Sequence, residues 1–296
     1  MIESRRTRLT TTFLVHSVMI IFALMCVTPL VAVLSISFTE EKSLTLDGYH
    51  LIPSKASATA YQFILRNPKQ IANSYLISFI VTALGMALSL LIISLLAFPL
   101  SRPDYRYRKP LTFYVFFTML FNGGLVPWYI LISRYLQLKN SLAVLIIPYL
   151  VFPWFVLILR TFFKQIPLSL FESAKIDGAT EFRSFFMILI PLSKPALATI
   201  GLFICLRYWN DWWLPLLYIE KESLVPLQYM LYRMMSNITF LTKQMTSTVV
   251  QIDVSNLPNE SARMAMCVLA AGPMLFIFPF FQKYFVRGLT AGSLKG

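Results

Sequence analysis

Charged side chains are scarce in this sequence. Asp, Glu, Lys and Arg make up 13% of the residues, whereas hydrophobic residues make up 57%. Water-soluble domains carry a larger share of charged residues, about 25%. The deficit excludes an ordinary soluble domain, and with the high hydrophobic content it indicates a membrane protein.

Residues with reactive or metal-binding side chains are also few. The two histidines, His16 and His50, lie far apart, and Cys26, Cys205 and Cys267 all fall within apolar runs. This distribution excludes a disulfide framework and metal-ligand spacing, and it brings no acid, base or nucleophile together. We therefore predict no metal site and no catalytic residues, and we do not interpret the chain as an enzyme.

A phosphate-binding loop of the form G-x-x-x-x-G-K-[ST] is absent as well. Such a loop is the usual cradle for ATP, so we expect no cofactor in this chain and, if ATP is used, an energy source in another subunit. The net charge of +13 does not require a nucleic-acid partner, because the placement of loops across a membrane accounts for it.

Long apolar runs are what the sequence does contain. A helix needs roughly 20 mostly apolar residues to cross a bilayer, and six runs reach that size: 11–38, 73–100, 111–133, 141–163, 196–219 and 262–286. They predict an all-α membrane protein with six transmembrane helices in a single transmembrane domain, 1–296. The first run is too long for a typical signal peptide and has no clear A-x-A site, so we interpret it as an uncleaved span.

The basic residues predict the topology. Lys and Arg are in excess on the side that holds both termini and the loop 164–194, and they are fewer in the segments 39–72 and 220–261. Because cytoplasmic loops carry the excess of Lys and Arg, both termini are predicted to be cytoplasmic. The loop 220–261 is then outside the cell, and it contains a short amphipathic helix predicted over 225–235.

Proline and glycine interrupt several of these runs. In a membrane, the backbone groups freed by a helix break must find partners, so broken helices line cavities or pack against other helices. This pattern favours transport over simple anchoring. The interruptions are Pro29, Pro99, Gly123 with Gly124 and Pro127, Pro148 with Pro153, Pro215, and Gly272 with Pro273 and Pro279.

The loop 164–194 has the punctuation of a helix. Ser169 and Glu172 have the spacing of a capping box, which predicts a helix that starts near Leu170. Gly178 is expected to end that helix in a left-handed conformation. We predict a short helix here on the cytoplasmic side of the membrane.

A second short helix is predicted over 181–189, with Pro191 ending it. In the first helix, Ser173 and Ala174 are small and lie beside apolar residues, so that face can enter a groove closely. Such a face is unfavourable in water, and it indicates a partner protein docked from the cytoplasm.

The same loop resembles a known motif. It reads ESA at 172–174, three residues, Gly178, nine residues and ILIP at 188–191. This resembles the "EAA" loop, E-A-A-x3-G-x9-I-x-L-P, of the permease subunits of ATP-binding-cassette importers, with Ser for the second Ala and Ile for Leu. Its position before the last two of the six spans is also similar.

Other stretches resemble carbohydrate importers of this class. FQKYFVRGLTAGSLKG, at 281–296, looks like the C-terminal tail of permeases of the maltose-transporter type. FNGGLVP at 121–127, PLSKPALA at 191–198 and YWNDWW at 208–213 are similar to the lipoprotein or polysaccharide subgroup, whose members mostly import oligosaccharides.

The resemblance implies a fold and a set of partners. The fold is the type I importer permease fold with a cytoplasmic coupling helix, in the bacterial cytoplasmic membrane. The implied partners are a second permease subunit, two ATPase subunits that bind ATP and Mg, an extracytoplasmic binding protein that contacts the loop 220–261, membrane lipid and an oligosaccharide.

The resemblance also implies roles for particular residues. Glu172 would act as cap and polar contact, Ala174 as the close-packing position and Gly178 as the hinge. The implied ATPase-coupling residues are Glu172, Ser173, Ala174, Asp177, Gly178, Ile188 and Pro191. The implied ATPase-contacting tail residues are Gly288, Leu289, Thr290, Gly292 and Lys295.

A charged and aromatic cluster lies in the fifth span. Arg207 falls near the midplane, and Asp211 follows it at i+4. Charges at that depth pair or face a wet cavity, and aromatic rings beside polar groups suit a sugar. The cluster is therefore a substrate path or gate, or alternatively an ion pair packed against a second permease. Its members are Arg207, Tyr208, Trp209, Asn210, Asp211 and Trp212.

An ion-coupled secondary transporter is the alternative function. Such a carrier works without an ATPase and needs ionisable relays near the midplane. Arg207 and Asp211 would be its only candidates, since Asp211 is the one carboxylate within a predicted span.

Overall fold

The computed structural model describes the backbone of residues 2–247 and 259–293, and the side chains of residues 11–240 and 259–282. Within these ranges the chain is helical, and its β-structure is limited to one isolated bridge between Thr39 and Ala56. The predicted all-α class is confirmed.

Three helices are long and apolar enough to cross a membrane without a break: α1 (Ile2–Ser37), α4 (Pro68–Ser101) and α15 (Glu260–Ser293). They contain the first, second and sixth predicted spans. Pro29 and Pro99 lie inside α1 and α4, so these prolines do not end the helices.

The other three candidate spans are bent pairs of helical segments. In each pair a Pro or Gly stands at or beside the break. Proline lacks a backbone N–H and interrupts the hydrogen bonds of a helix, so a break at these positions is expected. If each pair is one span, the described residues contain up to six. The first pair joins α5 (Arg108–Leu120) to α6 (Leu125–Ile130) and the π-helix η1 (Leu131–Tyr135), with a bend of 111°. The second joins α7 (Leu142–Ile146) and the 3-10 turn η2 (Ile147–Tyr149) to α8 (Pro153–Phe163), with a bend of 50°. The third joins α10 (Glu181–Ser184), the π-helix η3 (Phe185–Leu189) and α11 (Ile190–Leu192) to α12 (Lys194–Trp209) and α13 (Trp213–Tyr218), with a bend of 83°.

Short helices lie between these segments. They are α2 (Glu41–Asp47), α3 (Thr59–Ile64), α9 (Leu168–Ile176) and the 3-10 turn η4 (Glu222–Leu224), followed by the longer α14 (Leu227–Ser247). The helix predicted over 225–235 is therefore present, but it continues well beyond the predicted end.

The chain divides into two compact units. One comprises Met1–Pro68 and Arg233–Gly272, and the other comprises Lys69–Tyr232 and Pro273–Gly296. We call them unit 1 and unit 2 and describe each by itself. The expectation of one permease domain stays a prediction.

Unit 1 is held together at the start of α15. Both oxygens of the Glu41 carboxylate, on α2, accept hydrogen bonds from the first amides of α15: Glu260 N at 2.9 Å and Ser261 N at 3.1 Å. The Ser261 hydroxyl donates to the same carboxylate at 2.6 Å. The first amides of a helix have no partner within it, and a negative charge there is favourable. Glu41 thus caps α15 from a distant part of the sequence.

We predict that Glu41→Gln destabilises unit 1 by about 1 kcal/mol, since an amide retains the shape but loses the charge that faces the helix end. The matched control is Glu40→Gln, because Glu40 makes only an exposed ion pair with Lys55 at 3.9 Å. Thermal unfolding of the purified chain in detergent measures the difference. Equal shifts for the two variants would contradict the capping role.

Unit 2 is organised around the small, polar face of α4. Its buried residues include Ser74, Ser78, Thr82, Gly85 and Ser89, which recur every three or four positions and let neighbouring backbones approach closely. The Ser78 hydroxyl accepts a hydrogen bond from the amide of Leu227 at 2.8 Å. Small side chains thus allow close packing on this face of α4, as is typical of helix association in lipid, where the hydrophobic effect does not act between helices.

α12 packs against this face through Tyr208. A Cβ atom on Gly85 would lie 2.5 Å from the ring of Tyr208, so only glycine fits there. The Tyr208 hydroxyl donates to the carbonyl of Ile146 at 2.9 Å and lies 3.2 Å from the Ser89 hydroxyl. Next to it, Trp209 is 1% exposed.

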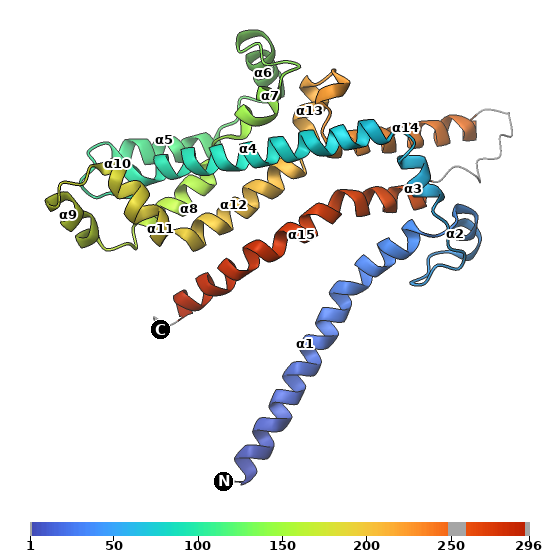
Figure 1. Ribbon diagram of the computed structural model, residues 1–296, viewed down its shortest axis with the longest axis horizontal. Coiled ribbons are helices and arrows are strands. Elements are labelled where there is room, and N and C mark those ends of the chain that lie inside the picture. Colours follow the sequence, from blue (N-terminus) through green and yellow to red (C-terminus); the bar gives the residue numbers. More distant parts are fainter. Residues whose placement is uncertain (1, 248–258, 294–296) are drawn as a thin grey trace. The chain divides into compact units, whose positions relative to one another are not determined.

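Figure 1 shows α4 running along unit 2, with α9 beyond the Ser101 end of α4 and with α5 and α8 along its last turns. The ring of Phe98, near that end, lies 5.8 Å from Phe171 of α9 and 5.7 Å from Phe185 of η3. The loop 164–194 is thereby attached to the end of α4.

We predict that Gly85→Ala destabilises the chain by about 1–3 kcal/mol, because the added methyl group overlaps a buried ring and must displace it. Gly272→Ala is the control, since a Cβ at that helical position meets no atom within 4 Å. Unfolding in detergent, followed by tryptophan fluorescence, compares the two. Equal behaviour would contradict the close approach of α12 to α4.

Candidate functional site

The helix α9 ends as predicted. Gly178 has φ of +75°, its amide bonds to the carbonyl of Lys175 at 3.1 Å, and the amide of Ala179 bonds to the carbonyl of Ala174 at 2.8 Å. These two bonds form a Schellman motif, which requires a left-handed residue and so favours glycine. The predicted left-handed termination at Gly178 is confirmed.

The predicted capping box of α9 is wrong. α9 begins at Leu168, directly after Pro167, and no side chain caps its N-terminus. Ser169 therefore lies inside the first turn instead of before it. Pro167 occupies the N-cap position with φ of −56°, and it has no side-chain oxygen that could accept from the first amides of the helix.

The predicted end of the second helix at Pro191 is also wrong. The helix begins at Glu181, where the Thr180 hydroxyl accepts a hydrogen bond from the amide of Arg183 at 3.3 Å. It then widens into the π-helix η3 and continues through Pro191 to Leu192. A π-helix bonds from residue i to i+5, so the register just before Pro191 is no longer that of the α-helix that a proline breaks.

One side of α9 is attached and the other is free. Phe171 is 4% exposed, and the Arg102 guanidinium lies 4.6 Å above its ring. Glu172 and Ser173 are exposed, Ala174 is partly buried, and Ile176 is 86% exposed. The exposed side therefore combines the Glu172 carboxylate, the small Ser173 and the apolar Ile176. The predicted face is wrong in part, because Phe171, expected on it beside Ser173 and Ala174, packs against the end of α4 instead.

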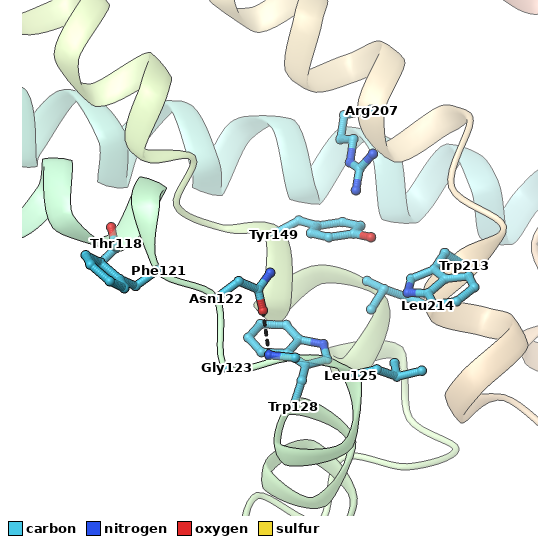
Figure 2. Close-up of a pocket in the computed structure, with 11 residues that line it drawn as sticks. Thr118, Phe121, Asn122, Gly123, Leu125, Trp128, Tyr149, Arg207, Trp213 and Leu214 are labelled. Atoms are coloured by element: carbon cyan, nitrogen blue, oxygen red, sulfur yellow. Dashed lines mark hydrogen bonds between the residues drawn. The ribbon is translucent and has the colours of Figure 1, made fainter.

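The second part of the site is a cavity of about 570 Å³ in unit 2 (Figure 2). It lies at the breaks between α5 and α6, between η2 and α8, and between α12 and α13. Its wall combines aromatic rings, an amide and a guanidinium. The lining includes Phe121, Asn122, Trp128, Tyr149, Arg207 and Trp213.

Helix breaks position the polar groups of this cavity. Gly124 has φ of +87°, and its amide donates to Asn122 Oδ1 at 2.9 Å, which satisfies the backbone between α5 and α6. This bond orients the Asn122 side chain in the wall, as Figure 2 shows. The FNGGLVP stretch thus forms the turn between α5 and α6 that lines one side of the cavity.

Arg207 and Asp211 meet through Tyr149 and not as an ion pair. The Arg207 guanidinium lies 4.5 Å above the Tyr149 ring, and the Tyr149 hydroxyl donates to Asp211 Oδ1 at 3.3 Å. Asp211 Oδ2 accepts from the amide of Leu214 at 3.3 Å, at the start of α13. The expected i,i+4 pair is wrong, since α12 ends at Trp209 and Asp211 is no longer on its face.

The structure separates the six residues of the predicted cluster. Arg207 lines the cavity, whereas Tyr208 and Trp209 are buried in the packing of α12 against α4. Asn210 accepts from Gln228 Nε2 at 3.3 Å, and Trp212 stacks on Tyr232 at 4.7 Å. These residues stabilise the end of the helix and do not line the cavity.

Sequence reasoning missed Tyr149 and Trp128, which line the same cavity as Arg207. Both lie beside helix breaks marked by proline, Pro148 and Pro127, so the interruption pattern was the signal that could have found them. The side chains of the predicted tail residues lie outside the described ones, as does Lys295 as a whole. Within the described residues, no group of three His, Cys, Asp or Glu could hold a metal ion.

The chain is helical and membrane-spanning, and its broken helices enclose a cavity. A further helix, α9, lies beyond the end of α4 and is exposed on one side. These features are typical of a transport permease. Residues 75–291 match the family described as binding-protein-dependent transport system inner membrane component. The match covers most of the chain. This protein therefore belongs to that family of multi-pass inner membrane permeases.

Individual relatives agree over almost the full length. A polygalacturonan/rhamnogalacturonan transport system permease protein of Bacillus subtilis is 38% identical over 289 residues, which cover 96% of this chain and 97% of the relative. A trehalose/maltose transport system permease protein of Thermococcus litoralis is 29% identical, covering 94% of each chain.

A solved structure has the same fold. It is a chain of a bacterial ABC transporter involved in the import of the acidic polysaccharide alginate, with a TM-score of 0.77 and 28% identity, covering 93% of this chain and 96% of the other. The predicted class, a six-span importer permease fold, is confirmed.

Proposed function

We propose that this chain is one of two permease subunits of an ATP-driven importer for acidic oligosaccharides, and that the cavity around Arg207 is part of the substrate path. The cavity is the observation that carries this proposal. It offers aromatic rings for the apolar faces of a sugar, an amide for its hydroxyl groups and a guanidinium for a carboxylate. The alternative, an ion-coupled transporter, has no support, because the family is one of binding-protein-dependent systems.

Arg207 lines the cavity and is not held in an ion pair. In the described part of the chain it makes no ion pair within 4 Å, and its guanidinium stacks on Tyr149, which separates it from the Asp211 carboxylate. A charge at such depth faces a wet cavity or a partner. Similarity to permeases of a polygalacturonan/rhamnogalacturonan system and of an alginate importer supports an acidic substrate.

We assign coupling to the loop 164–194. Its helix α9 exposes Glu172 and Ser173, with Ala174 partly exposed beside them, where a groove of an ATPase subunit would receive them. Asp177, Gly178, Ile188 and Pro191 complete the coupling set. ATP and Mg would be bound by the two ATPase subunits and not by this chain.

The remaining partners follow from exposed surface and topology. No residue of α5 is buried within the described chain, and Phe113 and Tyr114 on it are each 65% exposed. A face this apolar needs lipid or a second permease subunit. An extracytoplasmic binding protein would contact the loop 220–261. Both termini would lie in the cytoplasm, and the tail Gly288, Leu289, Thr290, Gly292 and Lys295 would contact the ATPase dimer.

Arg207→Gln tests the substrate path. In proteoliposomes holding the complete importer, we expect uptake of an acidic oligosaccharide, such as an oligogalacturonate, to fall by roughly tenfold or more, because a desolvated charge-assisted hydrogen bond is lost. Arg134→Gln is the control, since Arg134 is exposed and does not line the cavity. Unchanged uptake by the Arg207 variant would remove this cavity from the path.

Gly178→Ala tests coupling. A side chain at positive φ costs about 1–2 kcal/mol, so the variant should distort the end of α9. Gly48→Ala is matched to it, because Gly48 has φ of +80° and, like Gly178, has no atom within 4 Å of an added Cβ. We expect ATPase activity stimulated by the binding protein to fall severalfold for Gly178→Ala only. Equal effects on activity would contradict the assignment of coupling to α9.

A further inference from the structure

A second, smaller cavity in unit 2 has no role in the function proposed above. Its volume is about 300 Å³, and it lies between the ends of α4 and α8, the start of α5 and the first turn of α9. Three cations line it, Arg102, Arg108 and Lys164. The rest of the wall is largely apolar and includes Phe163 and Phe171.

Of the three cations of this cavity, only Arg102 has a carboxylate partner within the described residues, and the two arginines are held by contacts with the protein. Arg108 donates to the carbonyl of Arg102 at 3.5 Å. Arg102 is held between aromatic rings and meets one exposed carboxylate, Asp104, at 3.4 Å, while its Nη1 is buried without a hydrogen-bond partner in the structure. A buried guanidinium nitrogen without an acceptor is costly, so the geometry favours an added anion.

Mutual repulsion supports the same conclusion. Burial, followed by the nearby charges of Arg160 and Arg108, lowers the pKa of the Lys164 ammonium. Arg160 is fixed in this position by a 3.0 Å hydrogen bond to the carbonyl of Leu100. Arg108 also stands at the N-terminus of α5, whose first turn holds no acidic residue, where the helix dipole disfavours cations and favours anions. A bound anion would offset the repulsion among these cations and would interact favourably with the N-terminus of α5.

The position of the cavity selects the kind of anion. The apolar helices α4 and α8 end at Ser101 and Phe163, so the cavity lies at the level where hydrocarbon gives way to headgroups. Basic pockets between transmembrane helices at this level bind anionic lipid headgroups. The apolar part of the wall, with Phe163 and Ile166, suits the glycerol and first methylene groups of such a lipid better than a free ion.

We propose that this cavity is a binding site for the phosphate of an anionic phospholipid, such as phosphatidylglycerol, in the leaflet on the side of the loop 164–194. The phosphate would accept hydrogen bonds from Arg102, Arg108 and Lys164. Because Arg102 also stacks on Phe171 of α9, a bound headgroup would hold α9 in position against the end of α4. The lipid site itself does not depend on the proposed function. Only the conclusion that this leaflet is the cytoplasmic one rests on it.

The test is lipid binding to the purified full-length chain in detergent, with short-chain phosphatidylglycerol, short-chain phosphatidylcholine and inorganic phosphate as separate ligands. Arg108→Gln with Lys164→Gln removes two cavity cations. Arg106→Gln with Lys109→Gln is the matched control, since these exposed cations lie in the same segment but outside the cavity. We expect the first pair to weaken phosphatidylglycerol binding roughly 10- to 30-fold and the control pair to change it less than about twofold.

A variant that keeps the charge, Arg108→Lys with Lys164→Arg, should retain most of the binding and so separates loss of charge from misfolding. Equal binding of the two lipids by the unmodified chain would overturn the proposal, as would equal weakening by the two neutralised pairs. Binding of inorganic phosphate that phosphatidylglycerol does not displace would assign the cavity to a free anion. The assay involves neither sugar nor ATP, so its result is independent of the transport proposal.

Discussion

In hydrocarbon, every backbone amide freed by a break in a helix needs a partner within the protein. This requirement organises unit 2. The amide of Gly124 is satisfied by Asn122, and the amide of Leu214 is satisfied by Asp211. Each break thus holds a polar side chain at a defined place. The large cavity arises where three such breaks meet, so the solution of a backbone problem also provides the polar groups that a solute could bind.

The end of α4 connects this body to α9. Phe98, Arg102 and Phe171 form a stack of aromatic rings and a guanidinium that attaches α9 to the end of α4, a helix of 34 residues. If α9 couples to an ATPase as we propose, this attachment is where its movement would reach the membrane part. The cationic cavity lies in this same joint. The anionic lipid that we propose for this cavity would reduce the repulsion among its cations, and it would then connect the proposed coupling helix with the surrounding membrane.

Much of this organisation could be predicted from the sequence. Runs of apolar residues give the candidate spans, because length and hydrophobicity alone decide whether a helix can cross a bilayer. The loop 164–194 could be assigned to a helix ended by Gly178, since the left-handed termination is a local property of glycine. The start of that helix was predicted near Leu170 from the spacing of Ser169 and Glu172. The helix starts at Leu168 instead, directly after Pro167.

The pairing of distant residues could not be predicted. Arg207 and Asp211 suggested an ion pair on one helix face, but α12 ends at Trp209 and Tyr149, far away in the sequence, comes between them. Likewise, nothing local to Glu41 indicates that it caps α15. The sequence by itself determined the membrane class, the number of apolar runs and the charged loop, all of which depend on composition and local spacing. Only the tertiary structure decided which side chains line a cavity and which are buried, because that depends on where each helix breaks and on what packs against the break.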